Sequence, residues 1–556
     1  MIKIEIKYKE SEESFYIEQE CAEKTLLTLC RENHIYLDAL CAGNGACGKC
    51  RVQFLKGAPK PTEKERRILT TEEQQKGIRL ACCTIPKEDC EICLPKYHRE
   101  KINALNLQEI QSDSRVVCIH EQDKTCRYGI AIDIGTTTIA AVLVDMENGN
   151  TIAAETSVNH QRSYGADVIS RIQAANEGKG DLLQESIRDD ITMLIDRMIN
   201  QAEAAVSQIE KICIVGNTTM CHLLRGLSCT GLGAAPFVPT DISFYETSAK
   251  NIFGWENDQA KVVILPGISA FVGADVVAGI YANHMQESTQ ERLLLDIGTN
   301  GEMVLGNKNG FLVTSAAAGP VFEGGNIACG VPGIPGAVAH ATLSCGTKSK
   351  DLPGTERTIT SRYETIGEQP PVGICGSGII DVMSELVRLG IVDENGTMAE
   401  EWFEEGVPVA GEEVVFTQRD VREIQMGKSA IRAGIETLLA EYKKMRVKIK
   451  DADMDGVPEE VLLAGGFGYY MDADKAINIG LFPNSFKGRI RPVGNSALEG
   501  ARRYLLAEEA VAKRQIQQMI NCAQEINLAM HPTFQELYLQ HMFFEQRKGE
   551  GNGTKE

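Results

Sequence analysis

The segment LCAGNGACGKC, residues 40–50, constrains the fold of this chain more than any other, because it places three cysteines and three glycines within eleven residues. Thiols crowded in this way form a disulfide knot, hold a zinc ion or bind an iron–sulfur cluster. Eighteen cysteines spread over 556 residues are too few for a disulfide scaffold. The N-terminal sequence MIKIEIKYKE lacks the apolar run of a secretion signal, so we expect a cytoplasmic protein with reduced thiols.

The spacing of the cysteines separates the two remaining kinds of site. Cys41, Cys47 and Cys50 follow one another with gaps of five and two residues, and the next cysteines are Cys82 and Cys83. Zinc sites usually combine two short, well-separated pairs, whereas three ligands in one loop and a distant fourth are typical of a [2Fe–2S] cluster. Glycine lets such a loop turn sharply and direct backbone N–H groups at the sulfur atoms. We therefore expect a [2Fe–2S] cluster in this loop.

Residues 1–97 resemble a ferredoxin domain in cysteine spacing and in the expected order of elements. A hairpin, a helix, the cysteine loop and a strand are predicted in that order, which is similar to the β-grasp fold of the vertebrate-type and bacterial ferredoxins. The resemblance favours Cys82 over Cys83 as the fourth ligand, because the family's Arg-Leu-x-Cys segment matches residues 79–82. The metal ligands that it implies are Cys41, Cys47, Cys50 and Cys82.

The rest of the chain separates into a linker, a large body and a short tail. Residues 98–127 show little apolar periodicity and are predicted to be a linker, and residues 549–556 a disordered tail. Between them, apolar strands alternate with helical patterns such as 182–205 and 421–442, which predicts α/β layers. The segment that follows Leu505 is predicted to be helical. The fold class expected for the whole chain is α+β and α/β, with several domains.

Composition excludes two classes of partner. A formal net charge of −20 leaves no general basic face for nucleic acid. The most apolar stretch, 262–282, contains Pro266, three glycines and Asp275. It is therefore predicted to be a strand, a turn and a buried helix, and not a membrane span. We expect neither nucleic acid nor a membrane as a partner.

The body contains an internal repeat built on the tetrapeptide Asp-Ile-Gly-Thr. The segments IAIDIGTTTIAAVLVD (130–145) and LLLDIGTNGEMVLGN (293–307) each place it between two apolar strands. Two ordinary hairpins would be the simplest explanation, because Asp and Gly are common turn residues. Four matching residues in both copies favour a duplicated fold, with its halves at 128–285 and 286–548.

Each Asp-Gly turn presents backbone N–H groups and a hydroxyl to an anion, and a carboxylate to Mg²⁺. The two turns and the later VLLAGGFG (461–468) resemble the phosphate and adenosine motifs of the superfamily of sugar kinases, heat-shock chaperones and actin, which has a duplicated RNase H-like fold. The resemblance implies Mg²⁺-ATP as a cofactor, with Asp133 and Asp296 in the catalytic role. The nucleotide-binding residues that it implies are Gly135, Thr136, Thr137, Gly298, Thr299, Asn300, Gly301, Gly465, Gly466 and Phe467.

Three features of this resemblance leave alternatives open. Thr299 and Asn300 stand where many members of the superfamily carry glycines, which puts the rate and fate of hydrolysis in question. The segments GNTTM (216–220) and ICGSGIID (374–381) either line the same site or serve close packing of helix on strand.

Together, a ferredoxin domain, a short linker and an actin-like ATPase body resemble the reductive activators of corrinoid proteins. The resemblance covers nearly the whole chain. It implies ATP-dependent transfer of one electron to cob(II)alamin on the corrinoid protein of a methyltransferase system, which restores cob(I)alamin. It also implies an upstream electron donor, and a homodimer is a further expectation. Plant-type clusters lie near about −400 mV and the Co(II)/Co(I) couple of this family lies lower, so the transfer needs a driving force.

Two other functions could use the same modules. One is an ATP-gated electron donor to another low-potential enzyme, like the activators of 2-hydroxyacyl-CoA dehydratases, although the ligands of their [4Fe–4S] cluster are missing here. The other is a redox-sensing nucleotide-binding protein in which the cluster reports the redox state. ATP turnover that is stimulated by a corrinoid partner would distinguish the reductive activation of a corrinoid protein from both of these alternatives.

Overall fold

The structure is a computed structural model of the 556-residue chain. It describes residues 2–8, 14–19, 24–33, 43–94, 127–255, 260–347, 357–411, 413–448, 457–465 and 471–544, with positions 35, 37, 39 and 41. The chain divides into two compact units. The first contains the described residues up to Ile264 apart from 149–151, and the second contains those from Leu265 onward. The predicted tail and the predicted linker, except Arg127, lie outside the described residues.

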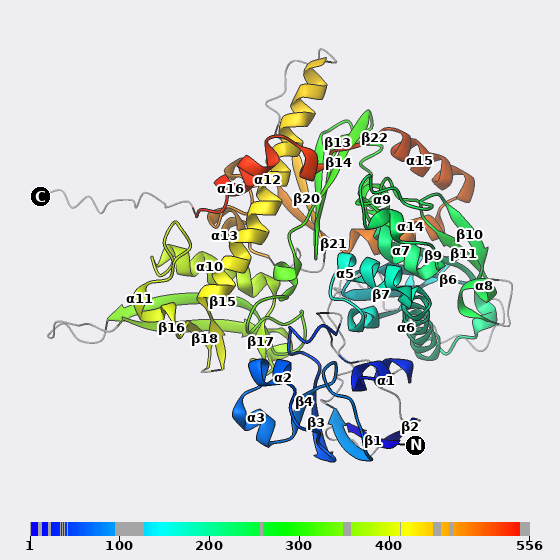
Figure 1. The fold of residues 1–556 in the computed structure, drawn as a ribbon. Coiled ribbons are helices and arrows are strands. Elements are labelled where there is room, and N and C mark those ends of the chain that lie inside the picture. Colours follow the sequence, from blue (N-terminus) through cyan, green and yellow to red (C-terminus); the bar gives the residue numbers. More distant parts are fainter. Residues whose placement is uncertain are drawn as a thin grey trace, which may run out of the picture. The chain divides into compact units, whose positions relative to one another are not determined.

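The N-terminal part of the first unit is a five-stranded mixed sheet with strand order β2-β1-β5-β3-β4. Ile2, Ile4 and Ile6 alternate with charged residues along β1 and are at most 7% exposed, as a strand with one buried face requires. β1 pairs antiparallel with β2 and parallel with β5, which confirms the predicted hairpin and the ferredoxin fold. The elements are β1 (Ile2–Tyr8), β2 (Ser14–Gln19), α1 (Leu26–Glu32), β3 (Arg51–Lys56), α2 (Glu63–Ile68), α3 (Thr71–Gln75), β4 (Ile78–Leu80) and β5 (Cys90–Leu94) (Figure 1).

The remainder of the first unit is built on a six-stranded sheet with strand order β10-β11-β9-β6-β7-β8. β6 pairs antiparallel with β7 on one side and parallel with β9 on the other. The predicted helix over 182–205 is confirmed as α6, which packs against β7. The strands are β6 (Tyr128–Ile134), β7 (Thr138–Asp145), β8 (Thr151–Val158), β9 (Ile209–Gly216), β10 (Tyr245–Ser248) and β11 (Lys261–Ile264), and the helices are α5 (Val168–Ala174), α6 (Gly180–Gln201), α7 (Thr218–Arg225) and α8 (Ala249–Phe253).

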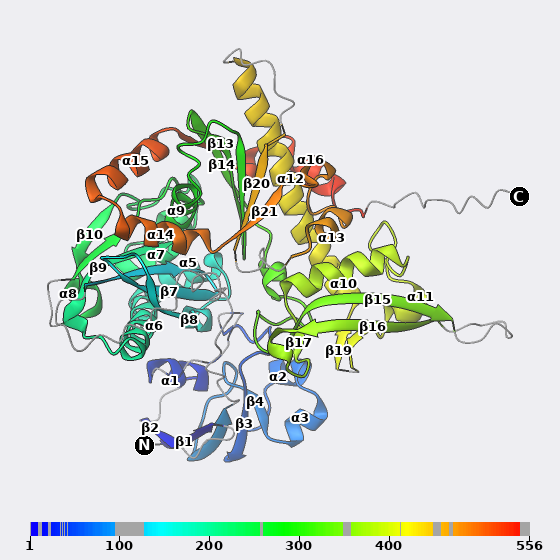
Figure 2. The same ribbon diagram turned by 180° about the vertical axis from the view of Figure 1, so that it is seen from behind.

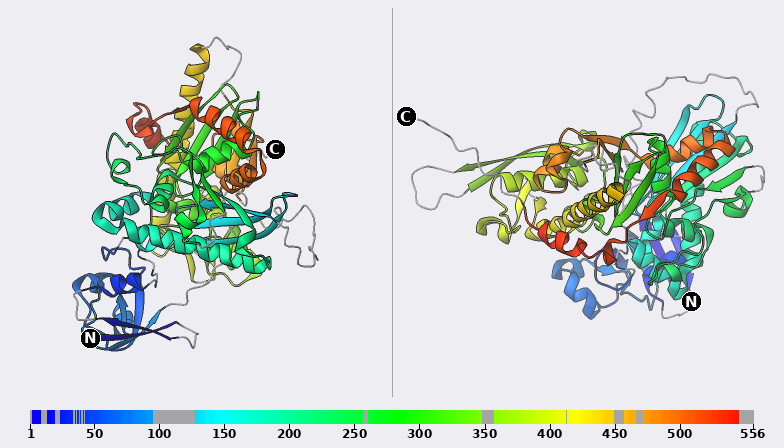
Figure 3. Two further views of the ribbon diagram at one scale, coloured as in Figure 1. Left: turned by 90° about the vertical axis from the view of Figure 1, so that its right-hand side faces the viewer. Right: turned by 90° about the horizontal axis from the view of Figure 1, so that it is seen from above.

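The second unit contains a second six-stranded sheet with strand order β21-β20-β12-β13-β14-β22. Its helices α9 (Ala274–Ala282) and α14 (Ser496–Leu506) lie side by side (Figure 2). The predicted helix over 421–442 is confirmed as part of α12 (Gln418–Lys448), which packs on β13 and β14 (Figure 3). The strands are β12 (Arg292–Ile297), β13 (Gly301–Asn307), β14 (Gly310–Ala316), β20 (Glu460–Ala464), β21 (Ile490–Gly494) and β22 (Ala523–Glu525).

The two six-stranded sheets repeat one plan. In each, the strand that ends in the Asp-Gly turn, β6 or β12, pairs antiparallel with the next strand. On its other side it pairs parallel with a strand from much later in its own unit, β9 or β20, and a further parallel strand, β11 or β21, follows. This shared order confirms the duplicated fold.

One expectation about the C-terminal region was wrong. The stretch after Leu505, expected to be helical throughout, contains α15 (Glu509–Asn521) and α16 (Phe534–Gln540) but also β22, which pairs parallel with β14. Local apolar spacing does not reveal such an edge strand, because its hydrogen bonds go to a strand about 210 residues earlier. The expected strand and helix in 262–282 are confirmed as β11 and α9.

The second unit also carries a three-stranded sheet of order β16-β15-β17, on which α10 packs. No helix in the described ranges is both long and apolar enough to cross a membrane. The boundaries at residues 97, 127, 285 and 548 stay predictions. The additional elements are α10 (Gly376–Arg388), α11 (Glu400–Phe403), α13 (Ala473–Asn478), β15 (Ala337–Thr347), β16 (Arg357–Thr365), β17 (Gly373–Ile374), β18 (Val407–Ala410) and β19 (Val414–Phe416).

Candidate functional sites

The four predicted cysteine ligands lie together as two pairs of thiols. The Sγ atoms of Cys50 and Cys82 are 3.3 Å apart, and the thiol of Cys47 hydrogen-bonds to that of Cys41. Across the described residues, no three His, Cys, Asp or Glu side chains are arranged to hold one metal ion. Two thiol pairs suit the two irons of a [2Fe–2S] cluster, each of which takes two thiolates, better than the single tetrahedral centre of zinc.

The glycines of the loop expose its backbone N–H groups to the thiols, as the sequence predicted. Gly43, Gly45 and Gly48 have φ angles of 94°, 73° and 66°, in the left-handed region that favours glycine. The N–H of Ala46 donates to Cys41 Sγ at 3.4 Å. Burial raises the pKa of Cys41, but backbone N–H groups outweigh it and lower that pKa to about 7. The loop therefore stabilises the thiolate, which is the form that binds iron.

A buried glutamate holds the distant fourth cysteine against the loop. Glu65 of α2 is 1% exposed and accepts hydrogen bonds from the N–H of Leu80 at 2.8 Å and the hydroxyl of Thr84 at 3.1 Å. Its other carboxylate oxygen caps α2 through Thr62. The segment that carries Cys82 is thus fixed at both ends. Sequence reasoning missed Glu65, although the capping box Thr-x-x-Glu that it completes is visible in the sequence.

The structure places the two candidate fourth ligands differently. Cys82 is 9% exposed and is the thiol that meets Cys50. Cys83 lies 3.7 Å from Cys82, and a Cβ added at Gly45 would come within 2.8 Å of its sulfur. Cys83 therefore packs beneath the loop backbone, and Cys82 completes the second pair. The assignment of Cys82 stays a prediction that this geometry supports.

The first Asp-Gly turn joins β6 to β7 and is closed by its own backbone. The N–H of Gly135 donates to the carbonyl of Thr138 at 3.0 Å, and a Cβ at Gly135 would lie 2.6 Å from that oxygen. Only glycine fits such a close approach. The carboxylate of Asp133 is at the end of β6, directly before this turn, and is partly exposed.

Two amide groups and one guanidinium surround the first turn, and those of Asn159 and Arg171 are fully buried. Asn159 donates to the carbonyl of Gly135 at 2.9 Å, and Asn217 donates to the hydroxyl of Thr136 at 3.0 Å. The fully buried Arg171 donates to the carbonyl of Thr136 at 2.6 Å. Two of these contacts fix the backbone that would face a phosphate, and the third fixes the Thr136 hydroxyl. Sequence reasoning assigned no role to Asn159 or Arg171, and it named Asn217 only as part of GNTTM.

One of these residues belongs to a motif that the sequence had singled out. Arg171, which is not part of that motif, also donates from its guanidinium to the carbonyl of Gly165 at 3.0 Å. Burial lowers its pKa to about 9. Asn217 lies in GNTTM and is the N-cap of α7, where its side chain accepts from the N–H of Met220. The structure thus places GNTTM at the first turn.

The second Asp-Gly turn, between β12 and β13, has carboxylates around it instead. The N–H of Gly298 donates to the carbonyl of Asn300, two residues later, at 2.9 Å, whereas Gly135 in the first turn donates to the carbonyl three residues later. The hydroxyl of Thr299 donates to Glu323 at 2.7 Å. Glu302 lies on β13, opposite Asp296 of β12 in the strand register. Neither Glu302 nor Glu323 was predicted, because a carboxylate beside a turn carries no distinctive sequence signal.

Asp275 at the start of α9 interacts electrostatically with Glu302. Burial raises the pKa of Asp275 to about 6. Burial first, and then the charges of Asp275 and Asp296, raise the pKa of Glu302 well above its ordinary value. Carboxylates whose pKa values are raised together compete for protons and attract a divalent cation, which relieves their repulsion. The second turn is therefore suited to Mg²⁺, and the first to an anion.

The predicted adenosine motif contains most of β20 and continues past its end, where Gly465 lies beside the second turn. Gly465 has a φ of 95°, and a Cβ there would lie 3.1 Å from Asp296 Oδ1 and 2.9 Å from the carbonyl of Ile297. Gly466 and Phe467 lie outside the described residues. Gly465 thus has the close backbone approach that the motif requires.

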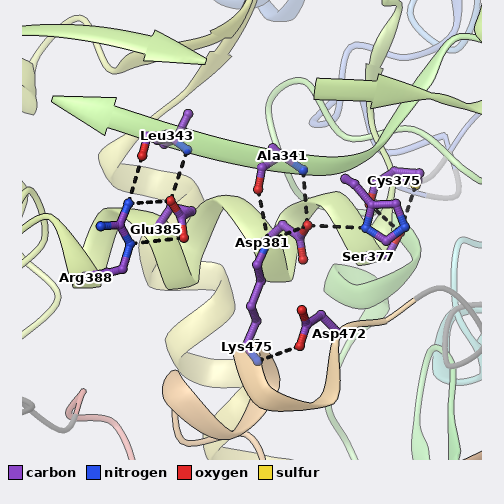
Figure 4. A network of polar contacts seen from close by, with 11 residues as sticks. Ala341, Leu343, Cys375, Ser377, Asp381, Glu385, Arg388, Asp472 and Lys475 are labelled. Carbon is purple, nitrogen blue, oxygen red and sulfur yellow. Dashed lines mark hydrogen bonds and ion pairs between the residues drawn. The ribbon is translucent and has the colours of Figure 1, made fainter. Parts of the chain in front are cut away.

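Of the two roles expected for ICGSGIID, lining the nucleotide site or packing a helix on a strand, the structure shows the packing. A Cβ at Gly378 of α10 would lie 2.2 Å from the carbonyl of Val338. One turn later, Asp381 is 1% exposed and contacts Lys475 at 2.7 Å and the N–H of Ala341 at 3.1 Å (Figure 4). Asp381 also hydrogen-bonds to His340 and raises its pKa. This network joins α10, α13 and β15.

Comparison with known proteins accounts for all three parts of the chain. The family described as "2Fe-2S iron-sulfur cluster binding domain" matches residues 10–87. "RACo middle region" matches residues 128–288, and "C-terminal domain of RACo the ASKHA domain" matches residues 290–552.

Two curated relatives and one solved structure extend over most of the chain. The corrinoid activation enzyme RamQ of Eubacterium limosum is 32% identical over 79% of this chain and 74% of its own length. The [Co(II) methylated amine-specific corrinoid protein] reductase of Methanosarcina barkeri is 27% identical over 74% of this chain and 76% of its own. A solved structure named "Reductive activator for corrinoid,iron-sulfur protein" covers 98% of both chains with a TM-score of 0.66 and 26% identity.

Proposed function

This chain belongs to the RACo-type family of reductive activators of corrinoid proteins, and we propose that it uses Mg²⁺-ATP to deliver one electron to the cobalt of a partner corrinoid protein. The substrate is cob(II)alamin held by a methyltransferase system, and the product is cob(I)alamin. The observation that carries this function is the presence, in one chain, of the paired-thiol loop and the duplicated Asp-Gly turns.

The N-terminal domain supplies the electron. When bound, a [2Fe–2S] cluster accepts and releases one electron at low potential. Cys41, Cys47, Cys50 and Cys82 would hold it, because their thiols already form two pairs. The backbone N–H of Ala46 would donate to a ligand sulfur, an interaction that tunes such clusters. Glu65 fixes the fourth ligand's segment.

The two Asp-Gly turns would bind the nucleotide. Asn159, Arg171 and Asn217 hold the first turn, whose backbone would contact phosphate oxygens. Asp296 and its neighbouring carboxylates would bind Mg²⁺ and orient water at the second turn. The remaining predicted binding residues, Thr137, Thr299, Asn300 and Gly301, belong to the same two turns or adjoin them. Binding energy from ATP would favour a conformation in which the uphill electron transfer is productive.

The partners extend this proposal. Relatives named as a corrinoid activation enzyme and a corrinoid protein reductase support a corrinoid protein as the acceptor. An upstream low-potential protein would reload the cluster, and a homodimer would be the assembled form. Reduced cysteines in the loop are needed for cluster binding, so the cytoplasm is the proposed location.

Reconstitution tests the function directly. Full-length protein, a chemical reductant, Mg²⁺-ATP and a corrinoid protein of a methyltransferase system are mixed, and the conversion of the cob(II)alamin spectrum to that of cob(I)alamin is followed. Omission of ATP should slow or stop the conversion. A protein cut after residue 97 should keep its red-brown colour and lose the reaction. Equal reduction by the isolated N-terminal domain would show that the ATPase body has another task.

A pair of serine variants tests the cluster ligands. Cys82→Ser should bleach the visible spectrum of the cluster, because it removes the thiol that pairs with Cys50. Cys83→Ser is the matched control and should leave the spectrum intact. The opposite result would move the fourth ligand to Cys83.

A further inference from the structure

Arg31, in the last turn of α1, is a buried cation that lacks hydrogen-bond partners on two of its nitrogens. The residue is 9% exposed. Its Nε and Nη2 atoms are buried and have no partner among the described residues. The adjacent carboxylate, Glu32, faces Lys24 at 2.9 Å and forms an ion pair with it. A buried charge without a partner is costly, so a purely structural role would be served better by an apolar side chain.

The position of Arg31 relates it to the cysteine ligands. Leu27 lies one helical turn before Arg31 on the same face of α1, and its N–H donates to the carbonyl of Ala81, directly before Cys82, at 3.0 Å. A Cβ at Gly43 of the loop would touch the side chain of Leu27 at 3.4 Å. The face of α1 that carries Arg31 therefore packs against the cysteine loop.

Electrostatics and packing agree with this placement. The guanidinium of Arg31 interacts electrostatically with the thiols of Cys50, Cys82 and Cys41. On another side it stacks over the ring of Tyr164, 4.6 Å from the ring centroid, within the same compact unit. The tyrosine ring supplies a favourable cation–π contact and shields the charge from water. It supplies no negative charge, so the charge of Arg31 remains available to the ligands.

We propose that Arg31 tunes the cluster: its buried charge stabilises the reduced form and raises the reduction potential. The inference rests on the proposed [2Fe–2S] site and goes beyond the choice of ligands. Reduction adds one electron, and so one negative charge, to the group that the four thiolates hold. A nearby fixed cation stabilises the more negative form more strongly, and burial limits the screening of that interaction. Arg31 would thus act on the cluster through the electrostatic field of its charge.

The midpoint potential of the full-length protein tests this role. The purified variants are titrated with a reduced one-electron viologen dye under argon, and the visible spectrum of the cluster is recorded. Arg31→Met keeps the length of the side chain and removes its charge. We expect its ratio of reduced to oxidised cluster, at a fixed dye ratio, to fall at least tenfold, which corresponds to about 59 mV for one electron.

Three further variants separate charge from packing. Arg31→Lys keeps the charge and should retain most of the wild-type potential. Tyr164→Leu should shift the potential in the same direction as Arg31→Met but by less, because water then reaches the guanidinium. Arg66→Gln removes an exposed cation of the same domain and should change the ratio less than twofold.

Two results would overturn the inference. One is a ratio in Arg31→Met within twofold of wild type. The other is an equal shift in Arg31→Lys and Arg31→Met, which would identify the side chain's shape as the cause. If Arg31→Met holds no cluster, Arg31→Lys and Tyr164→Leu are each compared with wild type. A retained potential in Arg31→Lys and a lowered one in Tyr164→Leu would support the inference, and the absence of a shift in Tyr164→Leu would overturn it. A wild-type protein without any cluster spectrum would instead contradict the proposed function itself.

Discussion

The two Asp-Ile-Gly-Thr turns share these four residues and each joins two antiparallel strands, but their surroundings are opposite. Hydrogen-bond donors, Asn159, Arg171 and Asn217, surround the first turn. Carboxylates surround the second, where Glu302 faces Asp296 in the strand register and Glu323 accepts from Thr299. A duplicated motif has therefore acquired two chemistries from neighbours outside it. Donors hold a turn in the shape that binds an anion, and carboxylates favour a cation.

The largest expected effect is at the second turn. Asp296→Ala should reduce ATP hydrolysis at least a hundredfold, because a carboxylate that positions Mg²⁺ and water supplies several kcal/mol to the transition state. The cluster spectrum should not change. The matched variant Asp133→Ala, in the first turn, should retain more activity, since donors and not carboxylates surround it. Steady-state phosphate release measures both, and equal losses would remove the functional distinction between the turns.

The next effect is at the first turn, where Arg171 donates to the carbonyl of Thr136. Arg171→Met should weaken ATP binding about tenfold, because a hydrogen bond from a charged group contributes about 1.5–3 kcal/mol. Isothermal titration calorimetry measures the affinity. Arg127→Gln removes an exposed arginine that pairs with Glu210 in the same unit and should leave the affinity unchanged. Unchanged binding in Arg171→Met would mean that Arg171 serves packing alone.

A smaller effect is expected in the pH dependence of protein stability, where Asp275 beside the second turn should contribute. Burial raises the pKa of Asp275 from 3.8 to about 6. Between these values the unfolded chain releases a proton that the folded chain keeps, so stability falls as the pH rises through this window. Asp275→Asn should therefore raise the Tm of the metal-free protein by a few degrees at about pH 7, and the gain should vanish near pH 4.

Asp241 of the first unit is the control with the opposite sign. Burial raises the pKa of Asp241, but the hydrogen bond from Arg225 outweighs this effect and the pKa is lowered to about 2. Its contribution to stability is present above pH 3.8 and is lost as the pH falls toward 2. Asp241→Asn should thus lower Tm at about pH 7. Thermal unfolding at several pH values measures both variants, and a Tm gain in Asp275→Asn that does not depend on pH would contradict the shifted carboxylate.

The smallest expected effect separates two tasks of Asn217. Asn217→Ser keeps an N-cap acceptor for α7 and loses the amide that donates to Thr136. We expect ATP affinity to fall about two- to fivefold, in line with about 0.5–1 kcal/mol for a neutral hydrogen bond, with Tm unchanged. Asn217→Ala should also lose the cap and about 1 kcal/mol of stability. Full affinity in Asn217→Ser would show that the cap is its main task.

The sequence by itself determined the parts of this protein whose signals are local. Cysteine spacing predicted three of the four thiols that meet in the structure, because they lie in one loop whose glycines fix its course. The choice of Cys82 over Cys83 came from the resemblance to ferredoxins. Alternating and helical periodicities predicted β1, α6 and α12, because each buries one face along a single segment. The duplicated Asp-Ile-Gly-Thr revealed the two related sheets, because the motif sits at the same place in each.

Only the tertiary structure decided what surrounds those motifs. Glu65, Arg171 and Glu323 act on backbone or side chains 15 to 35 residues away in sequence, and no local pattern marks such contacts. β22 pairs with a strand about 210 residues earlier, so its spacing alone predicted a helix. Arg31 is an ordinary helix residue in the sequence, and its role follows from burial beside the thiols. Hydrophobic periodicity specifies which face is buried, whereas the polar partners that a buried face meets depend on how distant segments pack.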